Sequence, residues 1–156
     1  MSDSYIEKNV NQIMKEKEDQ FPLNMAMASA WIMGNLKGIN LKVLDVTESS
    51  PLVDYFVLAS ANNPTQAQSM ADEIVRQMKR LGYKSLSKEG SNPDSDWILI
   101  DVGDIIIHIF LDISRDVYDL DRLWEEAVMV EIPQDYYFSE GVEETAGEGE
   151  EEKDYF

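Results

Sequence analysis

Residues 97–110 decide the fold, and they read Trp97-Ile98-Leu99-Ile100-Asp101-Val102-Gly103-Asp104-Ile105-Ile106-Ile107-His108-Ile109-Phe110. Two apolar runs, 97–102 and 105–110, flank the dipeptide Gly103-Asp104, and this pattern predicts two strands joined by a tight turn. A hairpin pairs its strands antiparallel, so the purely parallel doubly wound folds are excluded.

Upstream of the hairpin the sequence predicts three more strands, at 41–46, 54–60 and 83–88, the last at or near a sheet edge. A helix is predicted between the second and third of them, over residues 64–81. Asn63 is its expected cap, with Pro64 as the first helical residue; apolar side chains then recur at spacings of three and four until Gly82.

The remaining helices are predicted at 1–22, from Asn24 to Gly34 or Gly38, and at 118–124. Pro22 ends the first of them, Asn24 is a candidate cap of the second, and Asp119 is a candidate cap of the third. We therefore expect an α/β fold with a mixed β-sheet, a C-terminal hairpin and helices packed on the sheet. The expected divisions are an N-terminal arm or helix (1–23), a main domain (24–132) and an acidic tail (133–156).

Composition excludes several kinds of site. The chain has 156 residues, enough for one domain with a real core. It has no cysteine, which excludes disulfides, thiolate nucleophiles and cysteine-based metal sites. His108 is the single histidine, so a multi-histidine metal site is excluded as well.

The chain is strongly acidic, with 31 acids against 13 bases and a formal net charge of -18. Such a protein is repelled by nucleic-acid backbones and anionic lipids, and it favours a positively charged protein partner. Alternatively, the charge serves solubility alone. From residue 139 onward eight acids and one lysine give -7, which leaves -11 on the rest, and we expect this tail to be disordered.

The N-terminus lacks a basic region followed by an apolar stretch, and no apolar run approaches the ~20 residues that span a bilayer. We therefore expect a soluble cytoplasmic protein that does not enter membranes.

Catalytic patterns are weak. The glycines are scattered and form no phosphate-binding loop. His108 lies mid-strand between isoleucines, a position more typical of a hydrogen-bonded core histidine than of a general base. Asp101 and Asp104 bracket the turn and could hold a divalent metal, but aspartate at turns is favoured for local reasons, which is the preferred interpretation.

Trp97 is the better functional candidate. Strand alternation places Trp97, Leu99 and Asp101 on one face and the isoleucines of the same strand on the other, the natural core face. Trp97 follows the polar residues Ser95 and Asp96. Two interpretations stay open: a partly exposed binding hot spot with an acidic rim of Glu89, Asp96 and Asp101, or a core residue of a strand that is buried on both faces.

The chain from about 38 to 124 resembles the ribosomal silencing factor family, also called the Iojap-like family. The residues that carry the resemblance are Leu44-Asp45-Val46, Ser49 and Ser50, Asp54-Tyr55-Phe56-Val57, Ala71-Asp72-Glu73, Gly82-Tyr83, Glu89-Gly90, the stretch from Asp96 to Phe110, Arg115, Tyr118-Asp119-Leu120 and Leu123-Trp124.

The resemblance implies a nucleotidyltransferase-like topology that lacks the catalytic motif, and a cytoplasmic protein that is a homodimer when free. It implies binding to the large ribosomal subunit through its protein number fourteen, which blocks joining with the small subunit and represses translation. No enzymatic activity, cofactor, metal or direct sequence-specific contact with nucleic acid is expected.

By motif position, Trp97 would be the apolar anchor on that partner, with Tyr118 as a weaker candidate. Glu89, Asp101 and Asp104 would be acidic contacts to its lysines or arginines. Two other functions are kept as alternatives: a divergent metal-dependent nucleotidyltransferase-like enzyme that uses Asp101 and Asp104, and a dimeric scaffold.

Overall fold

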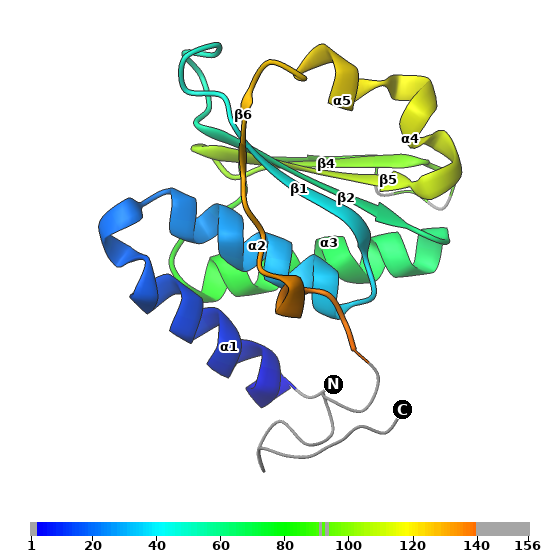
Figure 1. Cartoon of the computed structure of the whole chain (residues 1–156). Helices are drawn as coiled ribbons and strands as arrows, with labels where there is room; N and C mark the ends of the chain where they lie inside the picture. Colours follow the sequence, from blue (N-terminus) through cyan, green and yellow to red (C-terminus); the bar gives the residue numbers. More distant parts are fainter. Residues whose placement is uncertain (1–2, 91, 93, 140–156) are drawn as a thin grey trace.

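A computed structural model describes residues 3–90, 92 and 94–139 of the chain (Figure 1). Six strands form one mixed sheet in the order β3-β4-β5-β2-β1-β6. The strands are β1 (Ile39–Asp45), β2 (Tyr55–Ala61), β3 (Ser87–Glu89), β4 (Trp97–Asp101), β5 (Ile105–Leu111) and β6 (Val128–Val130). β2 and β5 run parallel and all other pairs are antiparallel, which confirms the predicted mixed sheet.

Helices lie on both faces of the sheet (Figure 1). One face is covered by α2 (Leu23–Asn35) and α3 (Pro64–Arg80), and α1 (Asp3–Glu16) packs on α2 as an outer layer. The short helices α4 (Asp112–Tyr118) and α5 (Leu120–Leu123) lie over the other face. Two 3-10 turns complete the fold, η1 (Glu18–Gln20) and η2 (Gln134–Tyr136).

The predicted hairpin is confirmed, and its turn fixes the register. Trp97 lies opposite Phe110, Leu99 opposite His108, and Asp101 opposite Ile106. Gly103 takes a left-handed conformation with φ of +95°, which glycine adopts without strain. The isoleucines of β4 are buried against the helices, while Trp97 and Leu99 are half-buried on the opposite face. Both faces of β4 are thus covered, one completely and one in part.

The predicted start and end of α3 are also confirmed. Asn63 accepts a hydrogen bond from the Gln66 backbone N–H at 2.8 Å, and Pro64 occupies the first turn. Gly82 follows the helix with φ of +97°. This helix was predictable because its cap, its apolar face and its stop signal are all local in sequence.

Several local expectations are wrong at their boundaries. α2 begins at Leu23, with Pro22 in the cap position, and Asn24 is buried inside the helix, where its amide points to the Met14 carbonyl at 3.4 Å. The strand expected at 83–88 is shorter and later, spanning Ser87–Glu89. The strand β6 was not predicted, because three residues with largely exposed side chains carry no usable alternation.

The helix expected at 118–124 is instead two helices, α4 and α5, that meet at Asp119. Asp119 has φ of +55°, which ends one helix before the next begins, and its side chain makes no capping hydrogen bond. α4 was missed because its apolar residues, such as Ile113 and Val117, face solvent and give no core-facing stripe.

The segment 133–139, placed in the acidic tail by its sequence, is folded. It forms η2, and Tyr136 is buried against α2, where its carbonyl accepts a hydrogen bond from the Asn35 amide at 3.1 Å. Gly34 has no side chain at the point where this carbonyl approaches, and a Cβ there would lie 2.2 Å from it. The tail boundary therefore belongs after this segment, and the disorder expected for 140–156 concerns residues outside the described part.

Two hydrophobic clusters occupy the two faces of the sheet. The larger joins the sheet to α1, α2 and α3, and it includes Ile6, Val10 and Ile13 of α1. The N-terminal helix is therefore part of the packed core and not a detached arm. None of the described helices is both long enough and apolar enough to cross a membrane.

Candidate partner-binding site

The candidate site is a group of rings on the sheet face beneath α4 and α5. We call Phe56, Trp97, His108, Phe110, Tyr118 and Trp124 the aromatic cluster. They come from β2, β4, β5, α4 and the end of α5, so residues far apart in sequence meet on one surface. Alternation along each strand directs these side chains away from the main core.

Trp97 is held by three ring contacts and one hydrogen bond. Its ring stacks on Phe110 with centroids 5.2 Å apart and lies 4.6 Å from Tyr118. Its indole N–H donates to Nδ1 of His108 at 3.2 Å. The structure thus places Trp97 between the two open interpretations: it is half-buried and packed, yet it reaches the surface.

Tyr118 is the most exposed ring of the cluster, with 39% of its surface accessible. Its hydroxyl donates to the Asp96 carboxylate at 2.6 Å. This hydrogen bond lowers the pKa of Asp96, as does a second one from Ser114, and it raises the pKa of Tyr118. The pair presents an aromatic ring and a fixed negative charge side by side, as an anchor for a partner with a basic surface requires.

His108 is buried, with 4% of its surface exposed. Because an indole N–H can only donate, Nδ1 of His108 is the acceptor and the ring proton sits on Nε2. Nε2 has no hydrogen-bond partner among the described residues. Burial lowers the pKa of His108 to about 4, so the ring is neutral at physiological pH. This agrees with a core histidine.

The three acidic candidates do not gather around Trp97. Glu89 is exposed on β3 and pairs with Leu99, which puts it on the same sheet face as Trp97. Asp101 and Asp104 lie at the hairpin turn, and Asp101 is four residues from Trp97 along the strand, about 13 Å. The acid that lies beside the aromatic cluster is Asp96.

Asp101 has a local structural role. Its carboxylate accepts a hydrogen bond from the Gly103 backbone N–H at 2.8 Å, which closes the turn. Among the described residues, no group of three acids or histidines is placed to hold a metal ion. The arrangement matches the turn interpretation of Asp101 and gives no geometric support to a metal site with Asp104.

Arg115 fixes α4 and α5 over the cluster. It is buried and bonds to both carboxylate oxygens of Asp121, at 2.9 and 3.0 Å. It also donates to the Ser60 hydroxyl at 2.9 Å and to the Asn40 carbonyl at 2.6 Å. Lys42 adds a second ion pair to Asp121 at 2.7 Å. The hydrogen bonds from Arg115, joined by that from Lys42, hold the pKa of Asp121 well below its usual range.

The loop before β4 sets the position of Trp97. Gly90 has φ of +80°, and a Cβ there would lie 2.0 Å from the Trp97 carbonyl oxygen. The Ser95 hydroxyl donates to that same carbonyl at 2.9 Å. Glycine is therefore required here both for its backbone conformation and for the close approach.

Sequence reasoning missed the contacts of His108 and Phe110 with Trp97, and it missed the bond of Asp96 to Tyr118, although it named Asp96 as an acid beside Trp97. For the first two a signal existed, because a two-residue turn at Gly103-Asp104 pairs 97 with 110 and 99 with 108. For Asp96 there was none, since its partner Tyr118 lies 22 positions away on a helix that was wrongly placed.

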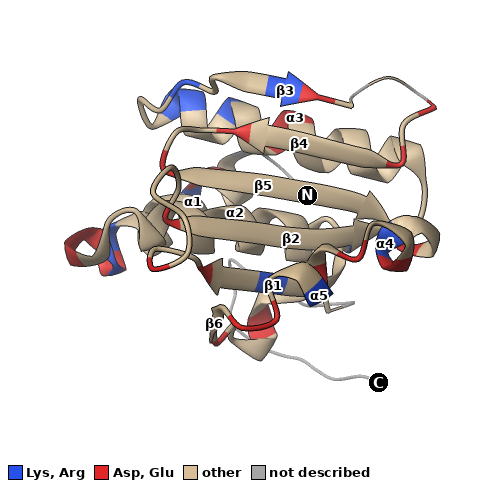
Figure 2. Ribbon diagram, turned by 90° about the horizontal axis from the view of Figure 1, so that it is seen from above, with Lys and Arg blue, Asp and Glu red and all other residues tan. Residues whose placement is uncertain are grey.

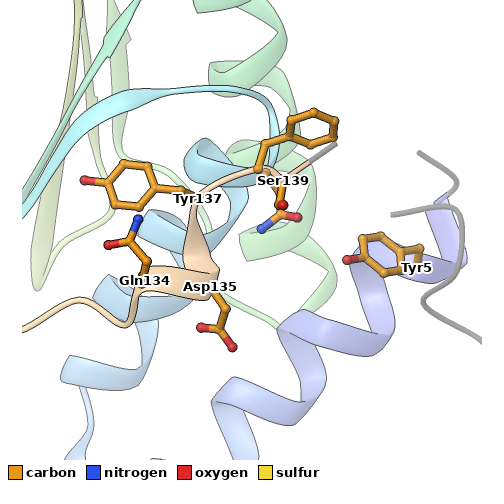
Figure 3. Close-up of a pocket in the computed structure, with 7 residues that line it drawn as sticks. Tyr5, Gln134, Asp135, Tyr137 and Ser139 are labelled. Atoms are coloured by element: carbon orange, nitrogen blue, oxygen red, sulfur yellow. The ribbon is translucent and has the colours of Figure 1, made fainter. Parts of the chain in front are cut away.

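A pocket of about 470 Å³ lies on the other side of the sheet (Figure 3). Its walls come from α1 and from the C-terminal segment, with Tyr5 on one side and Gln134, Asp135 and Tyr137 on the other. It shares no residue with the aromatic cluster.

A family model described as "Ribosomal silencing factor during starvation" matches residues 16–155. The ribosomal silencing factor of Haemophilus influenzae is 32% identical over 92 residues, which cover 59% of this chain and 89% of that protein. The mouse protein named mitochondrial assembly of ribosomal large subunit protein 1 is 32% identical over 85 residues, 53% of this chain and 37% of that one.

A crystal structure of a protein from Chromobacterium violaceum has the same fold, with a TM-score of 0.63 at 24% identity. The match covers 66% of this chain and 85% of that one.

Proposed function

Since this chain belongs to the ribosomal silencing factor family, we propose that it binds the large ribosomal subunit and prevents its joining with the small subunit. The contact is with protein number fourteen of the large subunit, and the result is repression of translation. The mechanism is steric: the bound protein occupies the joining face and no covalent bond changes. The mouse relative, which is named for assembly of the ribosomal large subunit, supports that subunit as the target.

The observation that carries the proposal is the exposed Tyr118 ring, which packs at a tilt against Trp97 and is hydrogen-bonded to Asp96. A ring already held by neighbours loses little conformational freedom on binding, which favours its use as an anchor. We propose that Trp97 and Tyr118 form the apolar centre of the contact. Glu89, Asp101 and Asp104 would then meet lysines or arginines at its rim, and the net charge of -18 would steer the encounter.

The first experiment is co-sedimentation of the purified protein with isolated large and small subunits, at a magnesium concentration that allows joining. We expect binding to the large subunit alone and a loss of joined ribosomes. Absence of binding at moderate salt would contradict the proposal.

The contact surface is tested with Tyr118→Ala, because Trp97 is packed and its replacement by glutamate would disturb the aromatic cluster. Loss of an anchor ring should weaken binding at least tenfold. Tyr118→Phe keeps the ring and removes only the bond to Asp96, so it should bind nearly as well. The matched control is Val117→Ala, an exposed residue of the same helix. Equal affinity of Tyr118→Ala and the control would remove Tyr118 from the contact.

The rim is tested by charge reversal. Glu89→Lys and Asp104→Lys change exposed residues and leave the packing intact. We expect each to slow association and to reduce its salt dependence. The control Glu18→Lys reverses an exposed charge beyond the end of α1, on the far side of the sheet. A control that slows association as much would show that only total charge matters.

We further propose that the free protein is a cytoplasmic homodimer that takes no cofactor or metal. Two chains of 17.8 kDa give 35.6 kDa, which light scattering distinguishes from a monomer. A rise in melting temperature with magnesium and nucleotides would instead favour the nucleotidyltransferase-like alternative. A stable dimer that never binds ribosomal subunits would favour the scaffold alternative.

A further inference from the structure

The positive charge of this acidic chain is concentrated at one corner of the molecule. Residues 74–88 contain no acid and five of the 13 bases. We call these the basic corner: Arg76, Lys79, Arg80, Lys84 and Lys88. Figure 2 shows blue segments gathered where α3 ends and β3 begins, while red is distributed over the rest of the ribbon.

Part of this charge has a structural explanation. Lys79 and Arg80 lie in the last turn of α3, where the helix dipole favours cations. Arg76 pairs with Glu73 at 2.6 Å, and Lys88 with Asp72 at 2.9 Å. These contacts neutralise two of the five bases.

The other three bases keep their charge. Within the described part of the chain, Arg80 donates only to neutral partners, the side chains of Gln77 and Asn11, both at 2.9 Å. Lys79 and Lys84 are exposed and form no ion pair with any residue that the structure describes. Lys84 lies beyond the helix, so the dipole does not explain it. At physiological ionic strength, charges more than about 8 Å apart are largely screened from each other, so acids on distant parts of the molecule do not offset these bases. The corner therefore presents a local positive surface.

Exposed apolar groups lie beside these bases. Phe21, from the link between α1 and α2, stacks on Tyr83 with ring centroids 5.8 Å apart and keeps 49% of its surface accessible. Leu86 is 71% exposed. The Phe21 ring is held on Tyr83, which lies in the chain between Arg80 and Lys84. Proteins bind unpaired nucleotides by combining an aromatic ring, which stacks the base, with cations that neutralise the phosphates.

We propose that the basic corner binds an unpaired segment of ribosomal RNA, with phosphates on Lys79, Arg80 and Lys84 and a base on Phe21. The inference rests on the proposed function, which brings the protein to an RNA surface. The corner adjoins the hairpin turn, since the Leu86 N–H donates to the Asp101 carbonyl at 2.7 Å. Acidic contacts to a basic protein and basic contacts to RNA would thus lie side by side, at a boundary between ribosomal protein and RNA.

The test compares the double variant Lys79→Gln/Lys84→Gln with a matched control, Lys8→Gln/Lys15→Gln. Both remove two charges from exposed lysines, and the control lysines lie on α1. Binding of a labelled twelve-nucleotide single-stranded RNA is followed by fluorescence anisotropy between 50 and 200 mM salt. We expect the slope of log affinity against log salt to fall by about 1.4 for the first variant, roughly 0.7 for each lost phosphate contact. Phe21→Ala should weaken binding about fivefold or more.

The same variants are then tested on the large subunit and on isolated protein number fourteen. Weaker binding to the subunit with unchanged binding to the isolated protein would support the inference. RNA binding that depends on Lys79 and Lys84, without any binding to the subunit, would overturn the proposed function and leave the RNA site standing. Equal slopes and affinities for the double variant and its control would overturn the RNA site.

The chain's own residues 140–156 are the competing occupant, because they carry seven net negative charges. Acetylation rates of Lys79 and Lys84, measured by mass spectrometry, distinguish a corner covered by residues 140–156 from a corner that is open to RNA. Rates that rise when residues 140–156 are deleted would show that the tail covers the corner, and would overturn the inference. Unchanged rates on deletion, with protection by RNA, would support it.

Discussion

At the scale of single residues, His108 couples the aromatic cluster to pH. The ring is neutral and buried, and its Nδ1 holds the Trp97 indole. An unpartnered N–H at Nε2 costs about 1–3 kcal/mol, and a second proton would cost more because it would charge a buried ring and remove the acceptor for Trp97.

Folding stability should therefore fall with acidity through His108. Its folded pKa of about 4 lies below the unfolded value of 6.5, so the unfolded chain takes up the proton first as the pH falls. The stability contribution is complete above pH 6.5 and declines toward pH 4. Between pH 7.5 and 5 we expect a loss of about 2 kcal/mol in the free energy of unfolding. Urea titrations at both values measure it.

The control for this prediction is His108→Gln, which does not titrate and offers an oxygen to the Trp97 N–H. When the free energy of unfolding of the variant is subtracted from that of the wild type at each pH, the contribution of the many carboxylates cancels. Parallel pH dependence of wild type and variant would refute the assignment to His108.

Substituting Gly82 and Gly90 by alanine distinguishes backbone strain from the steric clash of an added methyl group. Both have positive φ, but a Cβ at Gly82 meets nothing within 4 Å, whereas one at Gly90 meets the Trp97 carbonyl. Gly82→Ala should cost about 1 kcal/mol from backbone strain, and Gly90→Ala at least about twice that. Thermal unfolding measures both. Equal costs would mean that the loop before β4 moves freely.

At the scale of elements, α4 and α5 together bury little apolar surface, and polar contacts hold them to the sheet. Ile113, Val117 and Leu123 face solvent. The attachment depends on Arg115, whose guanidinium meets Asp121, Ser60 and Asn40 at once. A planar group with five donors can do this, and an ammonium cannot.

Arg115→Lys should therefore destabilise the protein by about 2–3 kcal/mol and loosen α4 and α5 selectively. Hydrogen exchange should show faster amide exchange in these helices than in β5. The Arg115→Lys substitution should also weaken binding to the large subunit, since α4 carries Tyr118. Arg122→Lys, an exposed change on α5, should do neither. Matching behaviour of the two variants would show that Arg115 does not fix these helices.

At the scale of the whole molecule, the distribution of charge has consequences of its own. Residues 139–156 carry -7 and the rest of the chain -11, so the folded part is acidic without its tail. Against this background the basic corner is a local exception. The proposed contact with a basic protein would therefore be favoured over most of the surface, whereas the proposed contact with RNA would require the basic corner to face the RNA.

Deletion of residues 140–156 should make binding to ribosomal RNA less discriminating. Removal of seven net negative charges reduces repulsion from phosphates, so non-specific binding to large and small subunits should rise at low salt. Co-sedimentation across a salt series measures this. An unchanged affinity and salt dependence would leave the tail without a part in docking.

Much of the fold could be predicted because its signals are local. Asn63, Pro64 and Gly82 define α3 by their neighbours alone, and Gly103-Asp104 fixes both the hairpin and the pairs across it. The motifs between Leu44 and Trp124 likewise carried the resemblance to the family, which the family match confirms.

Only the tertiary structure decided which distant residues meet. Ser60 and Arg115 are 55 positions apart, Asn35 and Tyr136 101 apart, and no periodicity encodes either contact. The sequence by itself determined the hairpin, α3 and the mixed character of the sheet, together with the charge and the identity of the candidate residues. Packing decided that Trp97 is half-buried, that Asp96 accepts the bond from Tyr118 while Asp101 closes the turn, and that 133–139 is folded. The reason is physical: local signals fix backbone conformation, whereas the pairing of side chains depends on how whole elements bury their surfaces together.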